Sequence, residues 1–136
     1  MAALDRSRFI QLLEQAPFSA MLGLKIESAA DGSATVRMPF DLRILNEGGP
    51  QAPIHGGAIA ALADVAACAA VWSLAATTRT ATISLTVNYT GFAVNSDLIA
   101  HARVKRTGKR IASLAVEIVD VSDALVADAL VSYKIA

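Results

Sequence analysis

The sequence predicts a mixed α+β domain in which a curved antiparallel sheet wraps around one long central helix. The stretch from about His55 or Gly56 to Ala75 is rich in Ala and Leu and contains no Pro, which favours a helix. Two strand-like runs precede this helix and four follow it. Because the helix is apolar on nearly all sides, a sheet must cover most of its circumference.

A short amphipathic helix is predicted first, over residues 4–16. Asp5 lies in its first turn, and Pro17 follows its predicted end. Its apolar side chains recur near helical spacing and are Leu4, Phe9, Leu12, Leu13 and Ala16.

Two strands and a loop connect this helix to the central one. Apolar residues alternate over 23–28 and 33–40, around Asp31-Gly32, which is a strong hairpin signal. Residues 41–54 are rich in Gly and Pro and are therefore predicted to be a loop, long enough to carry function.

Four further strands are predicted after the central helix, over 79–90, 97–106, 109–120 and 125–135. Residues 79–90 alternate strictly between apolar and polar side chains, which predicts one apolar face along the whole strand. Short turns follow the second and third strands, at Thr107-Gly108 and at 121–124. The pattern predicts an antiparallel meander.

Composition indicates a single domain over residues 1–136 that assembles into an oligomer. Hydrophobic residues make up 54% of the chain and charged residues only 18%, which suggests surface hidden between subunits. Twelve basic residues balance 12 acidic ones, so binding to nucleic acid is not expected. One Cys and two His cannot form a zinc cluster or a disulfide framework. We expect a cytoplasmic protein without a metal or cofactor.

Neither a signal peptide nor a membrane span is expected. Residues 1–8 carry charges and are not followed by an apolar segment. Residues 56–76 are long enough to cross a bilayer, but they are mostly Ala and include Asp64. A central Asp costs roughly 2.5 to 3.5 kcal/mol on insertion, which Ala cannot offset.

Asp64 is the first candidate for chemistry, because it lies in the middle of this apolar helix. A carboxylate buried without a partner becomes useful as a base or a nucleophile. The alternative is a structural Asp paired with an Arg or a backbone donor. The neighbouring side chains are small and would leave room for a ligand; they are Ala60, Ala61, Ala67 and Cys68.

His55-Gly56-Gly57 is the second candidate, where the loop becomes the helix. Free N–H groups and the positive end of the helix dipole lie there, and glycine permits close approach. The Gly57 N–H could stabilise a carbonyl oxygen that gains negative charge. The alternative is an ordinary helix start with His55 as its cap.

The spacing of these candidates implies two copies of the chain. Gly57 and Asp64 share a helix face but lie roughly 10 Å apart along the axis, so one substrate carbon cannot touch both. If both act on one carbon, they come from two subunits of a homodimer or homotetramer, with two equivalent sites per dimer.

These residues together resemble the acyl-CoA thioesterases of the PaaI type, which have the hotdog fold. The resemblance covers nearly the whole chain and rests on the spacing HGGxxxxLxD, from His55 to Leu62 and Asp64. It continues through Thr82-Ile83-Ser84-Leu85, Val87-Asn88-Tyr89 and Gly108-Lys109-Arg110. It implies hydrolysis of an acyl-CoA or aryl-acyl-CoA to the free acid and CoA.

The resemblance also implies roles for individual residues. The Gly57 N–H would polarise the thioester carbonyl, and Asp64 of the facing subunit would activate water or attack directly. His55 would orient the site, and Thr82 would hold the water. The family usually has an Asn six residues before the motif His, where this chain has Gly49; Asn46, three residues earlier, is a candidate replacement.

A basic cluster surrounds the predicted turn at Thr107-Gly108. It could bind the phosphates of CoA, or it could be only a solvated hairpin tip. Its members are Arg103, Lys105, Arg106, Lys109 and Arg110.

Two other activities compete with hydrolysis. A hotdog hydratase or dehydratase would need a His and an acid near the substrate α and β carbons, whereas His55 here precedes two glycines, which favours hydrolysis. A non-catalytic acyl-CoA-binding module would use the same pocket with a structural Asp64.

Cys68 is interpreted as a buried thiol, because a nearby carboxylate raises the pKa of a thiol. Core positions are expected at Phe18, Met21, Leu22, Phe40 and Trp72, although some of these side chains could instead line an acyl or aryl pocket.

Overall fold

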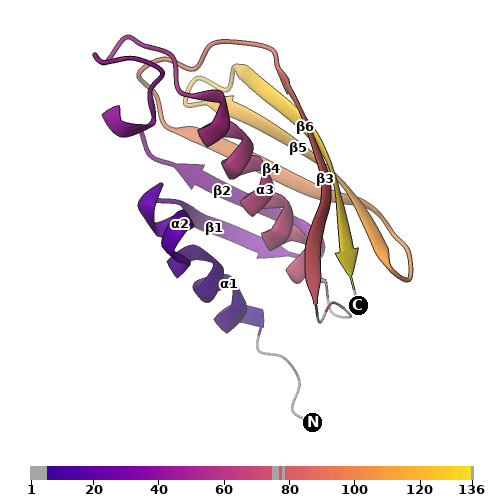
Figure 1. Cartoon of the computed structure of the whole chain (residues 1–136). Coiled ribbons are helices and arrows are strands. Elements are labelled where there is room, and N and C mark those ends of the chain that lie inside the picture. The colour runs from indigo at the N-terminus through magenta and orange to yellow at the C-terminus, as the bar shows by residue number, and fades with distance from the viewer. Residues whose placement is uncertain (1–5, 75–76, 78, 136) are drawn as a thin grey trace.

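The computed structural model describes residues 6–74, 77 and 79–135. It shows a six-stranded antiparallel sheet that curves around a long helix, α3 (Gly56–Trp72), with strand order β1-β2-β4-β5-β6-β3 (Figure 1). The predicted α+β architecture is therefore confirmed. The strands are β1 (Lys25–Ala30), β2 (Ser33–Met38), β3 (Thr80–Tyr89), β4 (Leu98–Thr107), β5 (Ile111–Asp120) and β6 (Leu125–Ile135).

Two short helices precede the first strand, and α1 packs against α3. The first, α1 (Arg6–Gln15), stacks Phe9 on Trp72 of α3, with ring centroids 3.7 Å apart. Pro17 does not simply follow a helix end, as the sequence suggested; it starts a second helix, α2 (Pro17–Met21). The first position of a helix tolerates Pro because its N–H would be unpaired there in any case. Leu4 and Asp5 lie outside the described residues.

The central helix is shorter than predicted at its C-terminus, because Ser73 caps it. The Ser73 hydroxyl donates to the Ala70 carbonyl and accepts the Gly32 N–H at 2.7 Å. Gly32 belongs to the β1–β2 turn, where Asp31 and Gly32 both have positive φ, as the hairpin signal predicted. Ala75, the predicted end, lies outside the described residues. In the described part of the chain, no helix is long and apolar enough to span a membrane.

The predicted four-stranded meander is only partly correct. Strands β4, β5 and β6 form a meander, but β3 pairs with β6 at the sheet edge while β4 pairs with β2. A tight hairpin cannot join β3 to β4 because residues 90–97 separate them, and this longer connection carries the chain across the sheet.

A β-bulge at Ile83 overturns the predicted single apolar face of residues 79–90. Thr82 pairs with Tyr133 and Ser84 with Ser132, so Ile83 is an extra residue. The extra residue reverses which positions face α3. Thr80 and Thr82 face it before the bulge, and Leu85, Val87 and Tyr89 face it afterwards.

The core lies between α3 and the sheet, and it contains the predicted Leu22 and Trp72. Phe18 and Met21, also expected in the core, are instead more than half exposed, because the short helix α2 buries Ser19 and not these two side chains. Apolar side chains are thus exposed on α2 and, at Ile83, on the edge strand. Such exposure is typical of surfaces that contact another molecule.

Candidate active site

Asp64 lies halfway along α3 and is held by two hydroxyl groups. Thr82 Oγ1 of β3 donates to Asp64 Oδ1 at 2.9 Å, and the Tyr133 hydroxyl of β6 donates to the same oxygen at 2.6 Å. Among the described residues, no cation forms an ion pair with this carboxylate. The alternative of a structural Asp–Arg pair therefore finds no support in this part of the chain.

A cavity of about 220 Å³ opens beside this carboxylate. Leu13 of α1, Cys68 of α3 and Ala81 of β3 line it together with Asp64 and its two donors. Burial, with a contribution from Asp64, raises the pKa of the Cys68 thiol to about 11. Burial likewise raises the pKa of Tyr133 above its usual range. Both groups are therefore protonated at neutral pH.

The start of α3 is capped as the sequence suggested. His55 is the N-cap residue, and its Nδ1 accepts the Gly57 N–H at 2.8 Å. The N–H expected to polarise a carbonyl is thus engaged by the cap. Both His55 and Gly57 are exposed, so solvent can reach this hydrogen bond.

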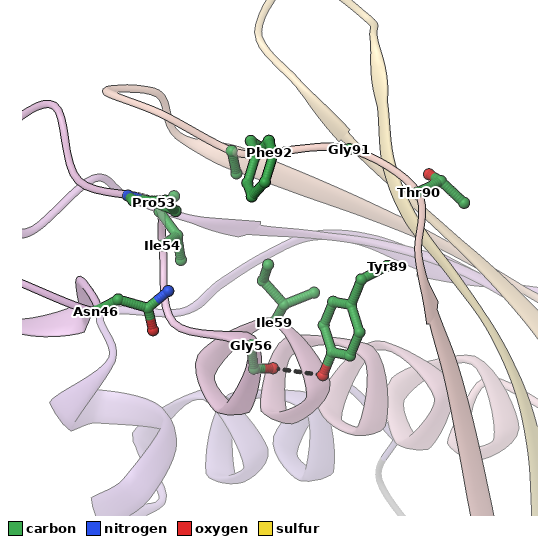
Figure 2. A pocket seen from close by; sticks show the side chains of 10 residues that line it. Asn46, Pro53, Ile54, Gly56, Ile59, Tyr89, Thr90, Gly91 and Phe92 are labelled. Carbon is green, nitrogen blue, oxygen red and sulfur yellow. Dashed lines mark hydrogen bonds between the residues drawn. The ribbon is translucent and has the colours of Figure 1, made fainter.

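A second cavity, of about 370 Å³, lies beside the start of α3 (Figure 2). Gly56 and Ile59 of the helix form one side, and Tyr89 and Phe92 form another. The Tyr89 hydroxyl donates to the Gly56 carbonyl at 2.7 Å, which connects the end of β3 to the first turn of α3. We call this space the helix-start cavity.

Asn46, and not Gly49, lines the helix-start cavity. The backbone explains why. The Asn46 N–H donates to the Pro53 carbonyl at 2.9 Å, and Leu45 bridges to Ile54, so the loop closes behind Asn46. Gly49 lies in the exposed tip beyond this closure, with a positive φ.

Within one chain, the two ends of the candidate site remain separate. Gly56 lines the helix-start cavity, whereas Asp64 lines the other one. Gly57, Ala60, Ala61 and Asp64 form the less buried side of α3, which the sheet does not fully cover.

The basic cluster lies on the β4–β5 hairpin, at the end of the sheet opposite the start of α3 (Figure 1). All five side chains are exposed, and none lines the Asp64 cavity or the helix-start cavity. Arg103 instead points to the outer face of the sheet beside His101.

Sequence reasoning missed two tyrosines that contact the candidate residues. Tyr133 hydrogen-bonds Asp64, and Tyr89 hydrogen-bonds Gly56. The alternation of residues 125–135 indicates that Tyr133 faces inward with Val131 and Ile135. Only the pairing of β6 with β3, which the sequence does not reveal, places it beside Thr82.

The curved sheet around one long helix is the hotdog fold of the thioesterases. Residues 53–127 match the family model described as the thioesterase superfamily, and the chain belongs to this family. Family membership supports thioester hydrolysis in general.

Individual relatives agree with this assignment. A Halobacterium salinarum protein named "Putative esterase VNG_1336C" is 35% identical over 107 residues, which cover 76% of this chain and 70% of that protein. The Escherichia coli PaaI protein of the phenylacetic acid degradation operon superimposes with a TM-score of 0.78 and 26% identity, over 95% of this chain and 92% of that one. The conserved protein PA5202 of Pseudomonas aeruginosa gives a TM-score of 0.81 and 28% identity, over 89% and 94% of the two chains.

Proposed function

We propose that this protein hydrolyses acyl-CoA or aryl-acyl-CoA thioesters, with Asp64 as the reacting carboxylate. The observation that carries this proposal is the setting of Asp64, a carboxylate beside a cavity with two hydroxyl donors and no cation among the described residues. A carboxylate that is not neutralised by a cation keeps its capacity to accept a proton or to attack a carbonyl carbon.

The reaction needs one water molecule and one group that accepts a proton and later returns it. Asp64 removes a proton from water, the water oxygen attacks the thioester carbon, and the carbonyl oxygen becomes an oxyanion. The oxyanion then collapses, the C–S bond breaks, and the thiolate takes the proton from Asp64. If Asp64 instead attacks directly, the thiolate leaves first and water hydrolyses the resulting anhydride.

The oxyanion requires a donor, and we assign this role to the Gly57 N–H. In the present structure this N–H donates to His55 Nδ1. Substrate binding therefore includes rotation of the exposed His55 ring, so that the carbonyl oxygen replaces Nδ1 as the acceptor. Asn46, which lines the helix-start cavity, supplies a second polar contact to the substrate.

A second copy of the chain completes the site. In two antiparallel α3 helices related by a two-fold axis near Ala60 and Ala61, Gly57 of one copy meets Asp64 of the other. The small, partly exposed side chains at these positions permit close approach. Strand β3 lies at the sheet edge, and an exposed edge strand is prone to pair with another chain.

We assign CoA as the carrier of the acyl group, because the exposed basic cluster suits its phosphates. The basic cluster on the β4–β5 hairpin can pair with the phosphates of CoA, from the same or a neighbouring subunit. A hypothetical thioesterase of Streptococcus pneumoniae TIGR4 shares the fold, with a TM-score of 0.82 and 21% identity over 93% of this chain and 96% of that one, and its structure was determined with coenzyme A.

The test is thiol release from short, medium, long and aryl acyl-CoAs by wild type and by Asp64→Asn. We expect Asp64→Asn to lose at least 100-fold in kcat, because the amide neither accepts the proton nor attacks. Asp123→Asn is the matched control: Asp123 lies in the β5–β6 turn with a positive φ, which Asn tolerates.

Two results would overturn the proposal. If Asp64→Asn turns over within a few-fold of wild type, Asp64 is not the reacting group. If wild type binds acyl-CoA but releases no thiol from any of these substrates, the protein is a binding module.

A further inference from the structure

We infer that Tyr133 is a positioning residue that, with Thr82, holds Asp64 Oδ1 and leaves Oδ2 as the oxygen that reacts. This inference rests on the proposed function and adds to it a residue that the sequence did not indicate. Its basis is the position of two hydroxyl groups, from β3 and β6, around one carboxylate of α3.

The backbone places the two hydroxyls side by side. Thr82 and Tyr133 are directly paired in the β3–β6 ladder, so their side chains lie on the same face of the sheet. That face is the one toward α3 because the bulge at Ile83 sets which residues of β3 point inward. The pair therefore reaches Asp64 without any movement of the helix.

Both hydroxyls bond the same carboxylate oxygen. Tyr133 donates to Oδ1 at 2.6 Å and Thr82 donates to it at 2.9 Å. The Tyr133 oxygen is also 2.9 Å from the Asp64 carbonyl, but its single hydrogen goes to the shorter, charged acceptor. Within the described residues, Oδ2 receives no hydrogen bond, so its lone pairs are available to a water or a thioester.

Tyr133 is a permanent donor in this position. It is almost completely buried, and burial raises the pKa of its phenol above the usual range, so the hydroxyl keeps its hydrogen at working pH. The other titratable group at the cavity is Cys68, whose pKa is raised to about 11. Cys68 and Tyr133 both stay uncharged at neutral pH, so neither places a charge beside Asp64.

The experiment compares the pH dependence of thioesterase activity in wild type and Tyr133→Phe, which removes only the hydroxyl. Without this donor the ionised carboxylate is less stabilised, so the acid limb of kcat/KM moves to higher pH by about one unit. At the plateau we expect kcat to fall about tenfold, with KM within about twofold, because the donor acts on the reacting group and not on substrate binding.

Paired substitutions at Thr82 test the same arrangement. Thr82→Val removes the other donor to Oδ1 and should move the acid limb in the same direction, whereas Thr82→Ser keeps the hydroxyl and should retain the wild-type profile. Thr35→Val, which removes a hydroxyl bonded to His101 on the outer face of the sheet, is the control and should change neither kcat nor the profile.

A second variant covers the case in which Tyr133→Phe does not fold, as urea unfolding would show. Tyr89 and Tyr133 are the two tyrosines of the chain, so fluorotyrosine incorporated into a Tyr89→Phe background labels Tyr133 alone. The more acidic phenol is a stronger donor, and the acid limb should move to lower pH relative to the unlabelled variant.

The outcomes separate this inference from the proposed function. If Asp64→Asn is inactive but Tyr133→Phe keeps the wild-type rate and acid limb, the inference is wrong and the proposed function stands. If Asp64→Asn is active, the proposed function fails. A folded Tyr133→Phe that loses activity with an unchanged pH profile also contradicts the inference, because the loss is then only structural.

Discussion

Asp64 accounts for the polarity of an otherwise apolar helix. Its side chain replaces hydration with two hydroxyl donors, which lowers the cost of placing a carboxylate beside the core. An Arg would cancel the negative charge of the carboxylate. The two hydroxyls stabilise this charge but do not cancel it. Under the proposed function, this carboxylate stays available to react.

The lone cysteine allows a test of the electrostatics around Asp64. Because Cys68 is the only thiol in the chain, iodoacetamide labels one position. Burial raises the pKa of Cys68 to about 11, so alkylation of the folded protein should be slow at pH 8 and should rise about tenfold per pH unit until about pH 11. Mass spectrometry of samples quenched over time gives the rate.

Unfolded protein in urea is the control. Its thiol should react as a free cysteine does, with half-maximal reactivity near pH 8.5. Since the folded state holds the proton more tightly, this group stabilises the fold below about pH 8.5, and that contribution is lost as pH rises toward 11. Equal reactivity of the folded and unfolded thiols at pH 8 would show that the cavity is open to solvent at Cys68.

Single residues were predictable from sequence where they break a pattern. Asp64 stands out because it is charged within an Ala-rich helix, and His55 because two glycines follow it. Tyr133 gives no such signal, because an inward-facing Tyr fits the apolar alternation of its strand. Its hydrogen bond depends on which strand lies beside it.

At the scale of elements, the existence of the strands was predictable but their neighbours were not. Alternation shows that residues 79–90 form a strand, yet it carries no information on pairing with β6. The Ile83 bulge was hidden for the same reason, because the apolar and polar residues alternate through it without interruption. Likewise, only the closure of loop 41–54 at Leu45 and Ile54 shows why Asn46 lines the helix-start cavity.

The β4–β5 hairpin yields a prediction about CoA. The double variant Arg106→Ala, Arg110→Ala removes two exposed charges near the tip. If these contact CoA phosphates, KM should rise severalfold for an acyl-CoA but not for the same acyl group on a phosphate-free thiol, with kcat unchanged. Steady-state kinetics at low and high salt checks this, because screening should shrink the effect.

A variant that removes an exposed charge from another part of the sheet is the control for the hairpin double variant. Lys25→Ala deletes an exposed cation of β1, away from the β4–β5 tip, and should leave KM unchanged for both substrates. An equal change for the two thioesters in the double variant, or no change for either, would show that the cluster is only a solvated hairpin tip.

At the scale of the whole molecule, the exposed surface and the divided site lead to the same conclusion. One chain leaves the β3 edge unpaired and apolar side chains exposed on α2, and it separates Gly57 from Asp64 along the helix. A dimer would cover exposed surface of this kind, and it would bring Gly57 of one subunit to Asp64 of the other. We therefore expect sizing at low micromolar concentration to show a dimer or a tetramer, and not a monomer.

Mixing two inactive variants tests whether the site is shared. Asp64→Asn lacks the carboxylate, and Gly57→Val places a side chain where the carbonyl must approach. A Cβ at position 57 would contact the His55 ring. In a mixed dimer, one site combines the intact Gly57 of the first variant with the intact Asp64 of the second. Random reassociation of equal amounts makes half of the dimers mixed, with one working site in each. About a quarter of wild-type activity should therefore return.

Thiol release after unfolding and refolding the mixture measures this recovery, and each variant refolded alone should stay inactive. If the refolded mixture is dimeric by sizing and no activity returns, Gly57 and Asp64 do not act on one substrate from two subunits.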